Sequence, residues 1–306
     1  MKTAYLMLFH KDPQLLRRAI KTLSCADCGF FVHIDEKSDF RKFSSIAEDQ
    51  VFFSQRRIPV HWGEFSQIEA TMLLLDEALF SSDYDYFVFL QGSTYPLRSG
   101  TYIQRFLEQN RGLEFMNAVK MPAPGYPLFK INTRRYPSDK PLRRFALRAL
   151  AKLGLAQRDY RKYLPGIEAY AGHACWALTR DACTYIRRFA ASNVHFVEYF
   201  RNTFAPDESF FHTIIGNSPF RANLRKNLVY ADWSASKGDH PSLLNDKHLR
   251  FFEAREKVWV EDEWGAGEML FARKLSDDRL DLVERIDGMI KGREDHEVTS
   301  LAHASL

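Results

Sequence analysis

The chain has no apolar run long enough to cross a bilayer, no long block of one charge and no low-complexity segment. Its 306 residues carry 43 lysines and arginines against 39 aspartates and glutamates, and this near balance argues against a nucleic-acid-binding protein. The formal net charge of +4 fits a mild attraction to anions such as nucleotide diphosphates or anionic lipids. With 45% hydrophobic residues, the chain is able to bury a full core.

The apolar run at the amino terminus ends at His10 after only six residues, which is too short for a secretory signal. A membrane-spanning helix needs about 20 apolar residues, and no segment approaches that length. We therefore expect a cytoplasmic protein, with peripheral contact at the inner face of the membrane as the alternative. An animal Golgi enzyme would need an anchor upstream of this sequence.

Cysteine is scarce, with four residues in the chain. Cys25 and Cys28 have the spacing that opens some zinc or redox sites, but Cys175 and Cys183 lack the matching second spacing. We therefore expect ordinary reduced thiols.

Apolar runs of strand length alternate with helical patterns along the chain, which predicts an α/β fold with a mainly parallel twisted sheet flanked by helices. The expected strands are Tyr5–Phe9, Phe30–Ile34, Tyr86–Leu90 and Gly172–Thr179. Short extended pieces are expected at Val51–Phe53 and Pro59–Trp62, and Asn227–Trp233 is also expected to be extended. The expected helices are 13–23, 66–79, 99–107, 181–191 and Leu280–Ile290, with another opening at Pro206.

We expect one catalytic domain over residues 1–306. It would comprise a nucleotide-binding half at about 1–110, an acceptor-binding and catalytic half at about 111–280, and a loose polar tail at 291–306. The basic segment Leu142–Leu164 is either a solvated helical face or a contact with anionic membrane or a lipid-linked acceptor.

The stretch Ala205–Thr213 combines a proline, two acids and two phenylalanines at a predicted helix start. Burial beside apolar rings would raise the pKa of one acid toward the range that a general base needs. From the residues alone, Asp207 and Glu208 are more often helix caps than catalysts.

Taken together, several segments in one order resemble the core-2/I-branching enzyme family of glycosyltransferases, which includes β-1,6-N-acetylglucosaminyltransferases and the peptide O-xylosyltransferases. They span about residues 4–275. The segments are Val32–Ser38, Val60–Ser66, Asp83–Leu97, Gly172–Arg180, Pro206–Thr213 with Asn217–Pro219, Asn227–Leu228 leading to Trp233, and Phe271–Lys274.

The resemblance implies a GT-A-type fold, inversion at the anomeric carbon and a sugar donor carried by UDP. Glu208 matches the catalytic base of the family. Asp35 falls at the position that contacts uridine, and Leu8 and Trp62 fall at positions that line the uracil. The expectation is that Glu208 shares one pocket with these donor-binding residues.

A divalent ion would require carboxylates at the exit of a strand in most GT-A enzymes. Asp83 and Asp85 precede the strand Tyr86–Leu90, and the exit of that strand, Gln91–Thr94, has no carboxylate. We therefore expect no metal cofactor, and we interpret the two aspartates as turn residues.

In the family, an arginine and a lysine near the carboxyl terminus neutralise the departing diphosphate. Lys274 matches the lysine, and Arg250 lies at about the right separation for the arginine, with Arg255 second. Fixed cations at such a site replace the charge that a metal ion would supply.

Acceptor contacts are predicted at four residues. Glu114 follows the helix after the Tyr95–Leu97 loop, where the family places an acceptor-binding glutamate, and Arg134, Arg135 and Trp233 complete the expected far wall.

The expected function is transfer of a sugar such as N-acetylglucosamine or xylose from a UDP-sugar to a carbohydrate hydroxyl. Because the sequence shows no anchor, we expect a bacterial member of the family that builds polysaccharides or glycoconjugates. The alternatives are a metal-dependent nucleotide-sugar transferase that uses Asp83 and Asp85, and a catalytically silent carbohydrate-binding protein of the same fold.

Overall fold

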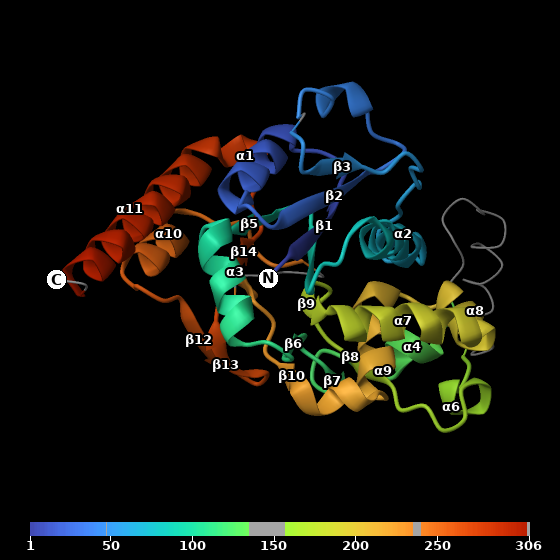
Figure 1. Ribbon diagram of the computed structural model, residues 1–306. Coiled ribbons are helices and arrows are strands. Elements are labelled where there is room, and N and C mark those ends of the chain that lie inside the picture. The colour runs from blue at the N-terminus through green and yellow to red at the C-terminus, as the bar shows by residue number, and fades with distance from the viewer. Residues whose placement is uncertain (47, 135–156, 235–239, 305–306) are drawn as a thin grey trace.

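A seven-stranded sheet forms the centre of the protein in a computed structural model, which describes residues 1–46, 48–134, 157–234 and 240–304 (Figure 1). The strand order is β10-β6-β9-β4-β1-β2-β3. The strands are β1 Thr3–Phe9, β2 Cys28–Ile34, β3 Val51–Phe53, β4 Tyr86–Gln91, β6 Glu114–Phe115, β9 Trp176–Thr179 and β10 Leu224–Arg225. Strands β1 to β4 run parallel, and β9 runs antiparallel to β4 and β6. The predicted α/β fold with a mainly parallel sheet is confirmed.

The apolar side chains of β1 are divided between two cores, one on each face of the sheet. Tyr5, Met7 and Phe9 belong to one core, while Ala4 and Leu6 belong to the other. This division follows from the two-residue period of a strand. A strand covered on both faces needs apolar residues at every position, which explains the unbroken run that marks β1 in the sequence.

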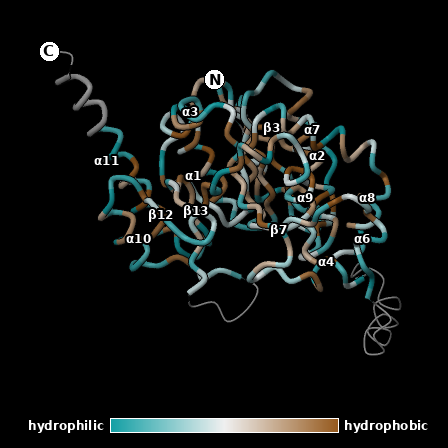
Figure 2. Tube along the Cα trace, turned by 90° about the horizontal axis from the view of Figure 1, so that it is seen from below, coloured by the Kyte–Doolittle hydropathy of each residue, from teal (hydrophilic) through white to brown (hydrophobic). Residues whose placement is uncertain are grey.

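Helices cover both faces of the sheet (Figure 1). The first core is covered by α1 Pro13–Leu23, α3 Gly100–Gln109, α10 Asp246–Glu253 and α11 Leu280–Ala304. The second core is covered by α2 Ser66–Ser81, α7 Arg180–Ser192, α8 Val194–Arg201 and α9 Phe210–Gly216. Figure 2 shows the resulting distribution, with hydrophobic residues gathered at the centre and hydrophilic residues along outer segments such as α10 and α6.

Smaller elements complete the fold. A three-stranded sheet has the order β11-β14-β5, and two pairs, β12-β13 and β7-β8, form separate ribbons. The bounds are β5 Thr94–Pro96, β7 Val119–Lys120, β8 Tyr170–Ala171, β11 Val229–Ala231, β12 Trp259–Asp262, β13 Gly265–Glu268 and β14 Phe271–Arg273, with short helices α4 Phe129–Asn132 and α6 Tyr160–Tyr163. Short 3-10 helices lie at Phe40–Lys42, Pro206–Glu208, Pro219–Asn223 and Asp277–Arg279.

One predicted extended piece forms no strand, and one predicted strand is shorter in the structure. Pro59–Trp62 forms no strand. Its backbone instead contacts the loop after β2, where Lys37 Nζ donates to the Val60 carbonyl. The strand predicted from Gly172 begins only at Trp176. The Gly172 amide donates to the Glu208 carbonyl at 2.9 Å and therefore takes no part in the ladder between β9 and β4.

The carboxyl-terminal helix is longer than predicted. Helix α11 continues past Ile290 to Ala304, through the segment that the sequence predicts as a loose tail. Arg293 explains part of this extension, because its guanidinium donates to the carbonyls of Leu97 at 3.3 Å and Phe252 at 2.6 Å. These bonds hold the first turn beyond Ile290 against α10.

The amino end of α1 is capped by a residue that is distant in sequence and not by the adjacent Asp12. The Asp277 carboxylate accepts hydrogen bonds from the amides of Gln14 and Leu15 at 3.1 and 2.7 Å. Asp12 instead accepts from the Asp277 amide at 3.2 Å. The negative charge of Asp277 also favours the positive end of the helix dipole.

The four cysteines are all free thiols. Over the described part of the chain, no helix combines the length and apolar character that crossing a membrane requires. Most of the basic segment, residues 142–156, lies outside the described residues. The central sheet takes strands from both sides of residue 110, so the two predicted halves share one sheet.

Candidate active site

Two neighbouring cavities open beside the carboxyl ends of the central parallel strands. The first, which we call the strand-end cavity, measures about 410 Å³ and is lined by Leu8, Asp35, Gln91, Arg273 and Lys274 among others. The strand register explains this grouping, because Leu8 pairs with both His33 of β2 and Gln91 of β4. Carboxyl ends of parallel strands are where open α/β sheets bind ligands.

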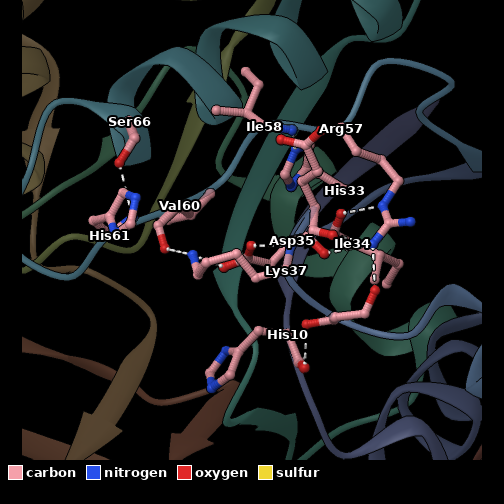
Figure 3. A network of polar contacts seen from close by, with 12 residues as sticks. His10, His33, Ile34, Asp35, Lys37, Arg57, Ile58, Val60, His61 and Ser66 are labelled. Atoms are coloured by element: carbon pink, nitrogen blue, oxygen red, sulfur yellow. Dashed lines mark hydrogen bonds and ion pairs between the residues drawn. The ribbon is translucent and has the colours of Figure 1, made fainter. Parts of the chain in front are cut away.

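Asp35 directly follows the carboxyl end of β2 and is held there by hydrogen bonds (Figure 3). Its carboxylate accepts hydrogen bonds from the Lys37 amide at 2.9 Å and from Lys37 Nζ at 2.8 Å, and the residue is 6% exposed. Arg57 fixes the same loop from the other side by donating to the carbonyls of Ile34 and Asp35 at 3.0 and 2.6 Å. The loop therefore presents a pre-organised carboxylate to the strand-end cavity.

Two adjacent cations line the strand-end cavity. Burial, followed by the charge of Arg273, lowers the pKa of Lys274 to about 8. Arg273 is 9% exposed, and its Nη1 donates to Gln91 Oε1 at 2.8 Å. Sequence reasoning named Lys274 and missed Arg273, although the two are consecutive in the same matching segment. An anion in this cavity would meet two poorly hydrated positive charges.

Arg250 and Arg255, the predicted partners of Lys274, lie elsewhere. Both are exposed, and neither is among the residues that line the strand-end cavity in the described chain. Helix α10 buries His248, Leu249 and Phe252 against the core, which leaves Arg250 on its outer side. Arg255 rests over the Phe251 ring, with 4.0 Å between the guanidinium carbon and the ring centroid.

The second cavity contains the two acids of the Pro206–Glu208 turn, and we call it the Glu208 cavity. It measures about 570 Å³. Ala205 enters the turn with a φ of 46°, and the Gly172 amide donates to the Glu208 carbonyl at 2.9 Å. The Glu208 side chain is 31% exposed, and its Oε2 is 3.2 Å from Lys130 Nζ. Lys130 itself lies over the Tyr126 ring, 5.0 Å from the centroid.

Asp207 is the acid that is removed from water. Burial, and then the charge of Glu208, raises the pKa of Asp207 to about 7. Its Oδ2 accepts from Gln91 Nε2 at 3.3 Å, and its Oδ1 is buried without a hydrogen-bond partner among the described residues. The sequence predicted one desolvated acid in this turn, and the structure shows that it is Asp207, whereas Glu208 is ion-paired.

Hydrogen-bonded polar side chains lie at the boundary between the two cavities. Gln91 lines the strand-end cavity and bonds Asp207, which lines the Glu208 cavity. Arg273 bonds Gln91 on one side and lies 3.5 Å from His173 Nε2 on the other. The sequence predicted that Glu208 shares one cavity with Asp35 and Lys274. In the structure, Glu208 lines the adjoining cavity instead.

Aromatic residues line the Glu208 cavity, and two of them are exposed. Trp62 and Trp233 are 54% and 49% exposed, and Tyr126 and Trp264 lie in the same wall. Trp62 thus lines the Glu208 cavity and not the strand-end cavity, but its ring is 5.2 Å from His240, which lines the latter. Flat exposed rings of this kind stack on the apolar faces of sugars or bases.

The predicted acceptor residues are dispersed. Trp233 lines the Glu208 cavity, whereas Glu114 is 1% exposed and bonds the amide and hydroxyl of Thr179 at 2.9 and 2.6 Å. The structure thus places Glu114 in the interior, at the start of α7, and not at the cavity. Arg134 is exposed and is not a lining residue of the described cavity, and Arg135 lies outside the described residues.

Asp83 and Asp85 lie at the amino end of β4, at the opposite end of the strand from Gln91. Asp83 is 94% exposed and pairs with Arg180 at 3.2 Å. The Asp85 carboxylate accepts from the Lys2 amide at 2.7 Å. Neither carboxylate lines the two cavities as far as the structure describes them.

Comparison with known proteins identifies relatives. Rat xylosyltransferase 2 is 24% identical over 246 residues, and human xylosyltransferase 1 is 22% identical over 247. Each alignment covers 78% of this chain, but the chain spans only about a quarter of either relative, 27% and 24%. A solved 4-diphosphocytidyl-2C-methyl-D-erythritol synthase overlaps 63% of this chain and 80% of its own, at 11% identity and a TM-score of 0.32, which is too slight to guide interpretation.

The family model of the core-2/I-branching enzymes matches residues 3–253, which include the Asp35 loop after β2 and both acids of the Glu208 cavity. The chain belongs to the core-2/I-branching enzyme family.

Proposed function

We propose that this protein is an inverting, metal-independent glycosyltransferase that moves a sugar from a UDP-sugar to a carbohydrate hydroxyl. The observation that carries the proposal is the shared wall between the two cavities, in which Gln91 bonds both Arg273 and Asp207. One cavity offers a carboxylate and two cations to a nucleotide diphosphate, and the other offers acids and exposed aromatic rings to a sugar. A donor whose sugar crosses this boundary would place its anomeric carbon between them.

The strand-end cavity is the proposed donor site. Asp35 accepts a hydrogen bond from the uracil, Leu8 packs against the base, and Lys274 and Arg273 neutralise the diphosphate. The volume of about 410 Å³ suits a nucleotide of this size. Trp62 contacts His240 at the boundary between the two cavities. From there its ring packs against either the nucleoside or the transferred sugar.

In the reaction, Glu208 takes the proton from the acceptor hydroxyl as that oxygen attacks the anomeric carbon. The bond from that carbon to the diphosphate breaks at the same time, and its electron pair leaves with UDP. Lys274 and Arg273 stabilise the charge that develops on the leaving group. The 3.2 Å ion pair with Lys130 fixes the Glu208 carboxylate in the cavity before the acceptor binds. An α-linked donor would give a β-linked product.

The relatives are named xylosyltransferases, so xylose is one candidate sugar and N-acetylglucosamine is the other that the resemblance implies. We propose a cytoplasmic protein, with the inner membrane face as a peripheral contact. We further propose that it contributes to polysaccharide or glycoconjugate synthesis.

A donor screen tests the proposal without knowledge of the acceptor. UDP-xylose, UDP-N-acetylglucosamine, UDP-galactose and UDP-glucose are compared with GDP-mannose by thermal shift and by slow hydrolysis. A ligand of the folded state raises its melting temperature by mass action. We expect UDP and at least one UDP-sugar to stabilise the protein, with hydrolysis of that donor. Equal or absent effects of UDP and GDP compounds would contradict a uridine site.

A further inference from the structure

A third cavity, of about 610 Å³, lies beside the Glu208 cavity and is used by no step of the proposed reaction. We call it the hairpin cavity, because one wall is the end of the β12-β13 hairpin at Glu263–Ala266. The opposite walls come from Met116–Val119 and from Leu224 of β10. The hairpin and Glu208 cavities have five lining residues in common, which are Asn117, Pro124, Lys226, Glu263 and Trp264.

The hairpin cavity has few polar groups to offer a ligand. Asn117 Oδ1 accepts from the Asn227 amide at 2.8 Å, and Lys226 Nζ donates to the Asp262 carboxylate. Arg225 Nη1 donates to the Leu224 carbonyl at 2.8 Å. Two of the four polar lining side chains, Asn117 and Lys226, are buried and bonded to protein partners, and the other two, Arg225 and Glu263, are exposed.

The remaining surface of the hairpin cavity is mostly apolar, from Met116, Val119, Leu224 and Trp264 among others. A sugar ring would bury hydroxyls here without adequate partners, which costs free energy. An alkyl or aromatic group would instead gain from the removal of its own surface and that of the cavity from water. The chemistry of the cavity therefore selects an apolar group.

A continuous set of contacts joins this cavity to the proposed base. Lys130 pairs with Glu208, the Tyr126 ring lies under Lys130, and Trp264 meets Tyr126 edge to face at 5.7 Å between centroids. Trp264 lines both cavities. An acceptor with its hydroxyl at Glu208 would therefore direct its other end past Tyr126 and Trp264 into the hairpin cavity.

We propose that the hairpin cavity binds an apolar aglycone of the acceptor, that is, an alkyl or aryl group joined to the sugar that receives the transfer. The inference rests on the proposed function, because that function places the acceptor in the Glu208 cavity. It adds the class of acceptor, which is an amphipathic glycoside instead of a free sugar.

The test compares methyl, octyl and phenyl β-glycosides of one sugar, each below its micelle concentration, using galactose, glucose, xylose and N-acetylglucosamine in turn. Binding is measured by tryptophan fluorescence in the presence of UDP, and transfer is measured as KM. We expect the octyl or the phenyl glycoside to bind at least tenfold more tightly than the methyl glycoside. Preference for octyl would identify an alkyl chain, and preference for phenyl an aromatic group.

The substitution Ala266→Phe fills the cavity at an exposed hairpin position where an aromatic residue is compatible with a strand. We expect it to reduce the preference to within twofold while the affinity for the methyl glycoside is unchanged. Ala254→Phe, an exposed alanine after α10, is the matched control and should keep the full preference. Equal affinity for all three glycosides in the wild type, or a preference that survives Ala266→Phe, would overturn the proposal.

The binding measurement needs no turnover, so the two proposals fail separately. A preference for apolar glycosides without any sugar transfer would support the aglycone site and contradict the transferase. Transfer to methyl and octyl glycosides with equal KM would support the transferase and contradict the aglycone site.

Discussion

The Asp207 carboxylate and the Gln91 side-chain amide, 116 positions apart in sequence, meet at 3.3 Å in the wall between the two cavities. Gln91 also accepts from Arg273 at 2.8 Å, so one side chain connects a cation of the strand-end cavity to an acid of the Glu208 cavity. Burial and the charge of Glu208 raise the pKa of Asp207, whereas the hydrogen bond from Gln91 and the charge of Arg273 oppose that rise.

Asp207→Asn should change how stability depends on pH. The pKa of Asp207 is about 7 in the folded protein against an ordinary value of 3.8, so the folded state holds this proton more tightly than the unfolded state. As pH rises from about 4 to 7, the unfolded chain loses the proton first, and the wild type loses stability. We expect the melting temperature of the variant, relative to that of the wild type, to rise across this window. The difference between the two melting temperatures should then stay constant above pH 7.

Asp83→Asn is the control for that measurement, because Asp83 is 94% exposed. Its melting curve should follow the wild type at every pH. A constant difference between Asp207→Asn and the wild type from pH 4 to 8 would contradict the raised pKa of Asp207.

UDP affinity should fall as pH rises through about 8. The pKa of Lys274 is lowered to about 8 in the free protein, and a bound diphosphate would favour its charged form and raise that pKa again. Binding of UDP near pH 8 should therefore take up a fraction of a proton. Calorimetry in two buffers of different ionisation enthalpy measures this uptake, and release of protons would contradict the assignment.

Lys274→Ala should weaken UDP binding by about tenfold or more, since a charge-assisted bond to phosphate is lost from a half-buried position. Arg250→Ala should bind UDP within twofold of the wild type, because Arg250 is exposed on the outer side of α10. Titration calorimetry of UDP with each variant measures the two affinities. A large loss in Arg250→Ala would instead support the original sequence prediction for Arg250.

Transfer or donor hydrolysis should survive excess EDTA. The proposed charge partners of the diphosphate are Lys274 and Arg273, whereas Asp83 and Asp85 lie at the far end of β4. Asp83→Ala and Asp85→Ala should likewise keep activity within about twofold. Loss of activity on chelation, restored by added divalent ion, would favour the metal-dependent alternative.

Local patterns were sufficient for most of the fold. The apolar runs of β1, β2 and β4 and the helical periodicity of α1 and α2 predicted their elements to within a few residues. The mainly parallel sheet flanked by helices agrees with the GT-A-type fold that the resemblance implied. The length of α11 was not predicted, because its extension beyond Ile290 involves bonds from Arg293 to residues that are distant in sequence.

The site was predicted less completely. Leu8, Asp35 and Lys274, which the sequence assigns to the donor, line one cavity. Trp62, which the sequence also assigns to the donor, lines the other cavity with Glu208 and Trp233. The separation of these two cavities depends on Gln91, which contacts residues more than 100 positions away, and no local pattern indicates such a contact. Arg250 was chosen by chain separation alone, whereas the position of Arg273 next to Lys274 was the better signal.

The most direct test of the account is the turnover of Glu208→Gln, which removes the proposed base while keeping the shape of the side chain. Removal of a general base costs about 10²- to 10⁴-fold in rate, and Glu198→Gln, an exposed surface acid, serves as the control. We predict that Glu208→Gln binds UDP with wild-type affinity and loses turnover by at least 100-fold, while Glu198→Gln keeps it. Wild-type turnover in Glu208→Gln would contradict the account.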